Sequence, residues 1–154
     1  MRFFLIDCIT RLRSFTHAEG IKCVSLAEDC FEHHFPGKPV YPGSLLVEGM
    51  AQLGGALMEL SLRKQGEPIP RCVLSKVAAK FRDFAHPGDR LVLRAEVVSH
   101  HAESARVRAR VLRDERCVAE AEMIYVILRI DDPALEASRR QYLADLTRAT
   151  RFEE

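Results

Sequence analysis

Residues 33–52 read HHFPGKPVYPGSLLVEGMAQ and place two histidines, a loop rich in proline and glycine, and an apolar segment in succession. Three prolines and two glycines between positions 35 and 43 restrict the shape of the loop. The apolar segment carries Glu48, and a lone carboxylate on an apolar helix is costly to bury without compensation. A histidine and a carboxylate can serve as an acid–base pair. The stretch therefore predicts a chemical site rather than ordinary surface.

An apolar helix is predicted over residues 44–64, with the sequence QGEP at residues 65–68 ending it. At about 1.5 Å per residue, this helix would be about 30 Å long. It is apolar on nearly all sides, so other parts of the chain must wrap it. Glu48, Gln52 and Glu59 interrupt the apolar surface, whereas a membrane span would be more uniform. We interpret it as a buried core helix and expect no membrane span.

Segments with strand character lie on both sides of this helix. Residues 3–13 and 20–26 alternate loosely between apolar and polar side chains, and residues 17–20 join them, which predicts a β-hairpin. A short helical turn is expected at residues 28–32. After the helix, four strands are predicted at residues 71–82, 89–100, 104–113 and 117–129.

The last two of these strands also predict their own register. Small apolar residues alternate with charged residues in both, and the charged faces carry Arg106, Arg108, Arg110, Glu120 and Glu122. Turning both apolar faces inward sets the arginines opposite the glutamates and favours a three-residue loop at 114–116. Two strands, a buried helix and four further strands indicate an α+β fold, in which a curved antiparallel sheet wraps a long central helix.

A second helix is predicted near the C-terminus. Asp132 is a good N-cap and Pro133 suits the first helical position. A narrow apolar stripe follows, formed by Leu135, Tyr142 and Leu146. We expect residues 1–130 to form the main domain and residues 131–154 to be a helical extension packed on it. Docking on its own domain or dimer is favoured, and a role in binding a partner is the alternative.

The bulk properties exclude several functional classes. A chain of 154 residues suits one domain, and 23 basic against 22 acidic side chains lack the basic excess of a nucleic-acid binder. Five cysteines, odd in number and scattered, show no zinc-ligand spacing and indicate free thiols in a reducing compartment. The apolar run at residues 1–7 is too short for a signal peptide, so we expect a cytoplasmic protein.

The loop and helix together resemble the signature of the β-hydroxyacyl-[acyl carrier protein] dehydratases, the FabZ/FabA group of the hot-dog fold. That signature runs Gly-His-Phe-Pro, then Pro-x-x-Pro-Gly, then a helix with Glu or Asp and, four residues later, Gln. The matching parts of this chain are HFP at 34–36, PVYPG at 39–43, Glu48, Gln52, KFR at 80–82 and PGD at 87–89. The resemblance covers about residues 20–128, and the predicted order of strands and helix is that of the hot-dog fold.

The resemblance implies loss of water from a 3-hydroxyacyl thioester on an acyl carrier protein, with no metal or cofactor. It implies that His34 is the base that takes a proton from the carbon next to the thioester carbonyl. Glu48 would be the acid that protonates the departing hydroxyl, and apolar surroundings would favour its protonated form. The N–H of Gly43, beside Ser44 at the start of the helix, would receive the thioester oxygen. Gln52, one turn beyond Glu48 on the same face, would hold Glu48 or a water, and the alternative is a polar side chain that only fills the core.

The resemblance also implies how subunits and partners assemble. In this family the histidine and the acid of one site come from different subunits, so a homodimer or a larger assembly of dimers is expected. An acyl tunnel between the subunits would be lined by Leu45, Met50 and Phe81. An acidic carrier protein would dock on Lys80 and Arg82, because the arginines of the strand at 104–113 already have glutamate partners.

Two other functions stay open. A hot-dog acyl thioesterase would use a helix carboxylate but would not need His-Phe-Pro, so His34 favours the dehydratase. A non-catalytic acyl-binding or assembly subunit of a specialised lipid or polyketide pathway is the second. It is kept open by His33 where the family has glycine, by Ser44 where it has valine, and by the added C-terminal helix. His33 is expected to reshape the mouth of the site.

Overall fold

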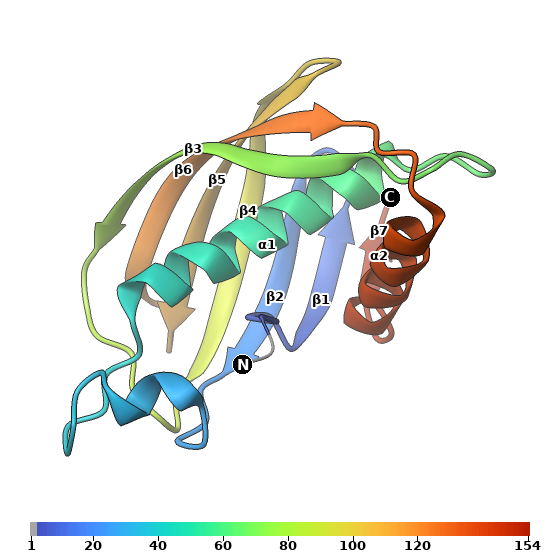
Figure 1. Cartoon of the computed structure of the whole chain (residues 1–154). Coiled ribbons are helices and arrows are strands. Elements are labelled where there is room, and N and C mark those ends of the chain that lie inside the picture. Colours follow the sequence, from blue (N-terminus) through green and yellow to red (C-terminus); the bar gives the residue numbers. More distant parts are fainter. Residues whose placement is uncertain (1–2) are drawn as a thin grey trace.

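The computed structural model describes residues 3–154 and shows a curved sheet around one long helix (Figure 1). The elements in chain order are β1 (Cys8–Arg13), β2 (His17–Cys23), the 3-10 turn η1 (Asp29–Glu32), α1 (Gly43–Leu62), β3 (Arg71–Phe81), β4 (Arg90–His100), β5 (Ser104–Arg113), β6 (Arg116–Leu128), α2 (Pro133–Leu146) and β7 (Arg151–Glu153). The seven strands follow the order β3-β6-β5-β4-β2-β1-β7. All neighbours pair antiparallel except β1 and β7, which pair parallel. The predicted hot-dog architecture is confirmed, with the helix, the sheet and the C-terminal helix in place.

The core lies between α1 and the concave face of the sheet. Twelve of the 20 residues of α1 are buried, which explains why the helix is apolar on most sides. The facing strands offer small side chains such as Ala95, Ala109 and Ala121, so a thick helix fits against the sheet. By length and hydropathy α1 could also cross a membrane, but 67% of its most apolar window is buried inside the fold.

The register of β5 and β6 is as predicted, but the loop between them is not. Arg108 lies opposite Glu122 and Arg110 opposite Glu120, with the apolar faces inward. The three-residue loop is wrong: Asp114 and Glu115 alone connect the strands, with φ angles of 49° and 63°. A shift in register between Val111 and Leu112 supplies the odd residue instead, so the side chains keep the same faces.

The N-terminal hairpin turns earlier than the sequence indicates. The predicted connection at residues 17–20 belongs to β2, and the turn lies at residues 14–16, where Phe15 has a φ of 55°. The glycine that suggested a turn, Gly20, instead permits close packing inside the sheet. A Cβ there would lie 3.1 Å from Cγ2 of Ile6 and 3.3 Å from Cδ1 of Leu53.

The C-terminal helix begins as predicted and lies beside β1 and the far end of α1 (Figure 1). The Asp132 carboxylate accepts hydrogen bonds from the amides of Ala134 and Leu135 at 3.0 and 3.1 Å. Its buried contacts come from Leu143 and Leu146, while Leu135 is 49% exposed. The chain then adds β7, which the sequence analysis did not predict, to the edge of β1.

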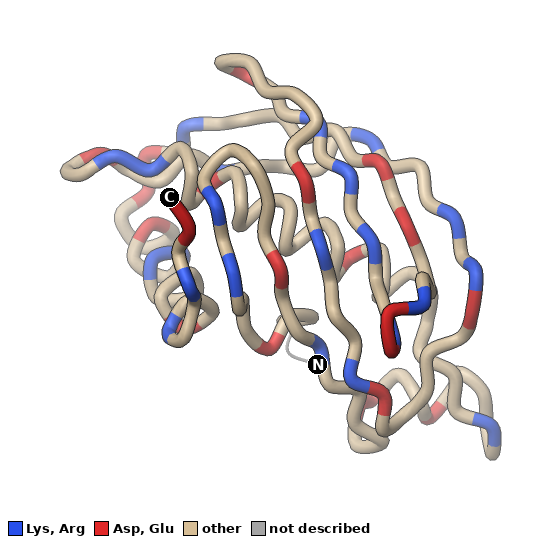
Figure 2. The backbone as a smooth tube through the Cα atoms, turned by 180° about the vertical axis from the view of Figure 1, so that it is seen from behind, with Lys and Arg blue, Asp and Glu red and all other residues tan. Residues whose placement is uncertain are grey.

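Basic and acidic residues recur along neighbouring strands of the sheet (Figure 2). Arg106 and Arg108 both bind the Glu122 carboxylate, at 3.3 and 3.1 Å. Glu120 binds Arg82 at 2.6 Å, although Arg110 is its partner in the strand register. The opposite charges on neighbouring strands therefore balance locally.

Candidate active site

His34 lies in the loop between η1 and α1, and a neighbouring carbonyl fixes its ring. Nδ1 of His34 lies 2.7 Å from the carbonyl oxygen of Val40. A carbonyl only accepts, so Nδ1 carries the proton and Nε2 of the neutral ring keeps a free lone pair. The Val40 amide donates back to the His34 carbonyl at 3.0 Å. His34 is thus prepared to accept a proton at Nε2.

The rest of this loop is a tight turn that presents aromatic and basic side chains. The amide of Lys38 donates to the Phe35 carbonyl at 2.9 Å, and Gly37 has a φ of 73°. The peptide bond between His34 and Phe35 is cis, and their rings stack with centroids 4.2 Å apart. His33 is exposed while His34 is half-buried, so the two adjacent histidines occupy different surroundings.

The start of α1 offers free backbone donors. The amides of Leu45 and Leu46 both donate to the Pro42 carbonyl. The amides of Gly43 and Ser44 have no partner among residues 3–154, as is usual in the first turn of a helix. A Cβ on Gly43 would lie 2.8 Å from Cε1 of Phe81, so only glycine allows this ring to pack there. An oxyanion could be held at this helix end.

Glu48 is held by Gln52, one turn further along α1. Nε2 of Gln52 donates to Oε1 of Glu48 at 3.1 Å and to the Phe3 carbonyl. Oε1 of Gln52 accepts from the Leu5 amide at 3.0 Å, and the hydroxyl of Tyr142 lies 3.5 Å away. These partners fix which end of the amide faces the carboxyl group. The predicted pairing of Glu48 and Gln52 on one face is confirmed.

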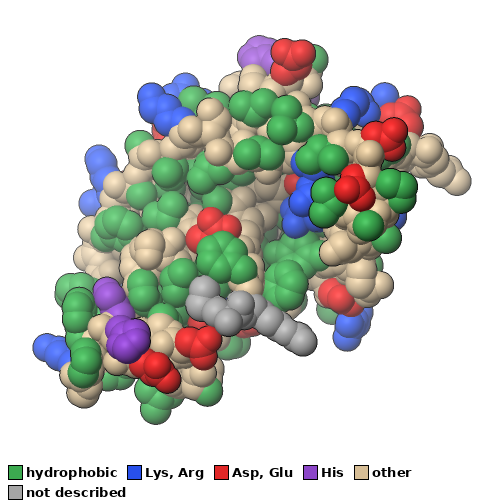
Figure 3. Space-filling view, viewed as in Figure 1, with side chains coloured by type: hydrophobic (Ala, Val, Ile, Leu, Met, Phe, Trp, Pro, Cys, Tyr) green, Lys and Arg blue, Asp and Glu red, His purple; other side chains and the backbone are tan. Residues whose placement is uncertain are grey.

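A cavity of about 320 Å³, here called the Glu48 cavity, borders this pair. Its lining includes Ala51, Tyr125 and the C-terminal Tyr142, but not His34. On the face shown in Figure 3, hydrophobic side chains gather over the helix and the histidines lie apart at its margins. Within residues 3–154 of one chain, His34 therefore does not border the cavity that Glu48 lines.

The predicted tunnel residues occupy three different surroundings. Met50 is fully buried in the core, Leu45 is half-buried, and Phe81 is 56% exposed at the end of β3. None of the three lines the Glu48 cavity. Of the predicted docking residues, Lys80 and Arg82 are both exposed, but Arg82 is paired with Glu120. Arg82, like Arg106 and Arg108, thus has a glutamate partner, whereas Lys80 has no ion pair with the described residues.

A second carboxylate on α1, Glu59, forms a buried ion pair that the sequence did not predict. It is 1% exposed, and Arg139 of α2 binds it at 2.6 Å. The Cys72 amide also donates to Glu59, at 3.0 Å. Burial raises the pKa of the Cys72 thiol to about 12, and the nearby Glu59 carboxylate adds to this shift. Two features of the sequence could have revealed this ion pair. Glu59 is a carboxylate within an apolar helix, and Arg139 lies between Leu135 and Tyr142 on the apolar side of the last helix.

Comparison with known proteins places this geometry in a family. The model of the FabA-like domain matches residues 1–122. The chain belongs to the FabA-like family. A 3-hydroxyacyl-[acyl-carrier-protein] dehydratase FabZ of Sulfurovum sp. is 39% identical over 130 residues, covering 82% of this chain and 87% of the relative. The FabZ of Wolinella succinogenes is 40% identical over 125 residues, covering 79% and 83%.

Solved structures support the same fold at lower identity. A hypothetical thioesterase from Streptococcus pneumoniae, determined with coenzyme A, has a TM-score of 0.62 and 16% identity. The match covers 78% of this chain and 84% of that protein. Within the FabA-like family, His34, Gly43, Glu48 and Gln52 all fall inside the matched region. The helix α2 and strand β7 lie beyond it.

Proposed function

We propose that this protein removes water from 3-hydroxyacyl-[acyl carrier protein] and forms the trans-2-enoyl thioester in fatty-acid or related acyl-chain biosynthesis. The observation that carries the proposal is the fixed His34 ring in a FabA-like chain that also holds Glu48 through Gln52. Nδ1 of this ring is bound to Val40, and Nε2 has no hydrogen-bond partner among residues 3–154. Relatives named as this dehydratase, at 39% and 40% identity over most of the chain, support it.

In this mechanism His34 and Glu48 divide the proton transfers. Nε2 of His34 takes the proton from the carbon beside the thioester carbonyl. The amides of Gly43 and Ser44 stabilise the charge that develops on the carbonyl oxygen. The Glu48 carboxyl group gives its proton to the hydroxyl, which leaves as water. His34 then holds one extra proton and Glu48 lacks one, and exchange with solvent restores both.

The active assembly is proposed to be a homodimer in which His34 of one chain meets Glu48 of the other. The separation of His34 from the Glu48 cavity within one chain supports this. So does β3, which is an edge strand that pairs only with β6, and whose residues 75–81 are all exposed. A second copy would cover the apolar side chains on this edge, among them Val77 and Phe81.

The partner that delivers substrate is proposed to be an acyl carrier protein in the cytoplasm. Lys80 and Arg82 lie exposed at the end of β3, near Phe81 and therefore near the start of α1. Positive charge there would attract an acidic carrier to the mouth of the site.

The test is to incubate the purified protein with a panel of 3-hydroxyacyl carrier-protein thioesters. We expect loss of one water in the mass of the acyl carrier and growth of enoyl absorbance. His34→Ala protein is the matched control and should give both signals at least about 100-fold more slowly. Release of the free hydroxy acid would favour a thioesterase instead. Binding without turnover across the whole panel would favour the acyl-binding subunit, and either result would contradict the proposal.

A further inference from the structure

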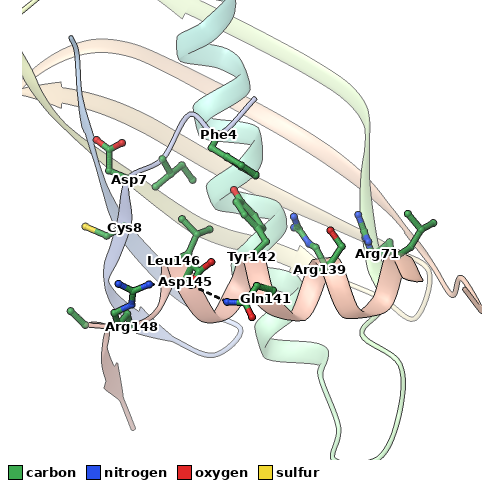
Figure 4. A pocket seen from close by; sticks show the side chains of 14 residues that line it. Phe4, Asp7, Cys8, Arg71, Arg139, Gln141, Tyr142, Asp145, Leu146 and Arg148 are labelled. Atoms are coloured by element: carbon green, nitrogen blue, oxygen red, sulfur yellow. Dashed lines mark hydrogen bonds and ion pairs between the residues drawn. The ribbon is translucent and has the colours of Figure 1, made fainter. Parts of the chain in front are cut away.

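A second and larger cavity lies beneath the C-terminal helix (Figure 4). This helix cavity has a volume of about 920 Å³ and lies between α2, β1 and the N-terminal segment. Its apolar lining includes Ile6, Leu135 and Leu146. The charged side chains of its lining all have partners: Asp145 pairs with Arg148 at 3.1 Å, and Arg139 and Arg71 lie 2.6 and 3.9 Å from Glu59. The carboxylate of Asp7 accepts a hydrogen bond from the Cys23 amide at 2.6 Å. The cavity therefore suits an apolar group better than an ion.

The Glu48 cavity runs toward this second cavity along one stripe of α1. Its residues on that helix are Glu48, Ala51, Gln52, Gly55 and Glu59. These positions recur every three or four residues, so they share one face. From residue 48 to residue 59 the stripe spans about 16 Å of helix at about 1.5 Å per residue. An extended chain that entered beside Glu48 would follow this stripe toward α2.

Two aromatic rings stand where the two cavities meet. Phe4 and Tyr142 line both cavities, together with Arg71 and Arg139. The rings of Phe4 and Tyr142 stack with centroids 5.1 Å apart and planes 21° from parallel. Figure 4 shows them facing each other between α1 and α2. We call this stacked pair the aromatic partition.

Tyr142 is the fixed half of the partition, and Phe4, which is 54% exposed, rests on its ring. The guanidinium of Arg139 lies 4.8 Å from the ring centroid of Tyr142, and Glu59 fixes that arginine. Burial raises the pKa of the Tyr142 hydroxyl, so it stays protonated and can donate to Gln52 Oε1 at 3.5 Å. Tyr142 is thus tied both to the ion pair of the far end and to the residue that holds Glu48.

We propose that Phe4 and Tyr142 set the length of acyl chain that the site accepts, by closing the Glu48 cavity against the helix cavity. This inference rests on the proposed acyl-thioester substrate. A chain that ends before the partition is bound fully, and methylenes beyond that point find no apolar space. Removing either ring joins the two cavities and lets the chain continue under α2.

The test measures binding of saturated acyl-pantetheine thioesters of increasing length by calorimetry, alongside dehydration rates for the matching 3-hydroxyacyl carriers. Each methylene buried in an apolar cavity strengthens binding by about fourfold. The wild-type affinity should rise with length and then level off. In Phe4→Ala and in Tyr142→Ala the levelling point should move to longer chains. Tyr142→Phe, which keeps the ring, should leave it in place.

A second pair of variants tests whether the added methylenes enter the helix cavity. Ser138 lines that cavity and Ala137, its exposed neighbour on α2, lines neither. Ser138→Trp in the Phe4→Ala background should return the levelling point to the wild-type length, and Ala137→Trp should not. An unchanged levelling point in a folded Phe4→Ala protein would overturn the inference. Wild-type protein that binds the thioesters but dehydrates none would instead contradict the proposed function. The binding series would still show whether Phe4 and Tyr142 limit the length of the bound acyl chain.

Discussion

His34 and Gln52 show how single contacts fix the orientation of side chains whose two ends look alike. Either nitrogen of a neutral imidazole can carry the proton, and the Val40 carbonyl decides the matter for His34. Either end of a side-chain amide can face a carboxyl group, and the Leu5 and Phe3 backbone groups decide it for Gln52. The neighbours of the reacting groups are therefore part of the design of the site.

At this scale we predict the effect of removing each reacting group. His34→Ala and Glu48→Gln should each lower kcat by about 10²- to 10⁴-fold, because each removes one proton-transfer group. Circular dichroism should remain unchanged, since neither side chain is fully buried. Rates come from enoyl absorbance with a saturating carrier substrate. His33→Gly is the matched control and should retain activity, because His33 is exposed and lacks the Val40 contact. A dead His33→Gly beside an active His34→Ala would reverse the assignment.

The sequence predicts residues that act within one motif, and misses pairs that the fold brings together. His34, Gly43, Glu48 and Gln52 lie within 20 positions, so loop and helix patterns suffice to find them. The ion pair of Glu59 and Arg139 joins positions 80 residues apart, and no local pattern announces it. The turn at Phe15 escapes for another reason. A positive φ at an aromatic residue is rare, and the surrounding strands impose it.

In the element α1, the adjacent residues Gly54 and Gly55 have different surroundings. A Cβ on Gly54 would lie 2.5 Å from the hydroxyl oxygen of Tyr125, which donates to the Ala51 carbonyl at 2.7 Å. A Cβ on Gly55 would meet its nearest atom, in the same ring, at 3.7 Å. One glycine makes room for a buried ring, and the other only lines a cavity.

We therefore predict opposite signs for two neighbouring substitutions. Gly54→Ala should lower the free energy of unfolding by about 1–3 kcal/mol, because Tyr125 must move and weaken its hydrogen bond. Gly55→Ala should raise it by up to about 1 kcal/mol, because alanine favours the helix and meets no clash. Urea denaturation of the two variants under identical conditions gives the comparison. Equal destabilisation by both would mean that helix geometry, rather than the Tyr125 contact, sets the limit.

The elements that the sequence locates best are those with long periodic patterns. The predicted register of β5 and β6 holds because both strands alternate small apolar and charged residues. The predicted three-residue loop between them is wrong. Keeping both apolar faces inward requires one extra residue, but it does not fix where along the two strands that residue lies. The register shift beside Leu112 supplies that residue inside the strand pair. The strand β7 has only three residues, too few for a pattern.

For the whole molecule, the proposed sharing of the site between two subunits predicts complementation between two inactive chains. His34→Ala and Glu48→Gln proteins, mixed and allowed to exchange subunits, should regain activity toward half that of wild type in each mixed dimer. One site of the mixed dimer then holds both native residues, and the other holds neither. Native mass spectrometry establishes that exchange has occurred. Complete exchange without recovery would mean that both residues act within one chain.

Docking of the carrier gives the last prediction. Lys80→Glu combined with Arg82→Glu should raise KM for the carrier-bound substrate by about tenfold, through weaker encounter, and the effect should shrink at high salt. A pantetheine thioester without carrier should be affected little. Arg106→Glu combined with Arg108→Glu is the matched control, since these arginines also bind a glutamate on the sheet. Equal losses on both substrates would place Lys80 and Arg82 in the framework of the site.

The short strand β7 has a consequence for how far the sheet can grow. A sheet with two open edges can add copies at both sides and extend into a filament. Here β7 covers the edge of β1, and Glu153 ties it down through Arg11 and His17 at 2.6 and 2.8 Å. A strand of three residues offers few backbone hydrogen-bonding groups to a strand of another chain. Association through β3 would therefore be self-limiting, because joining two sheets would use up the only long open edge that residues 3–154 form.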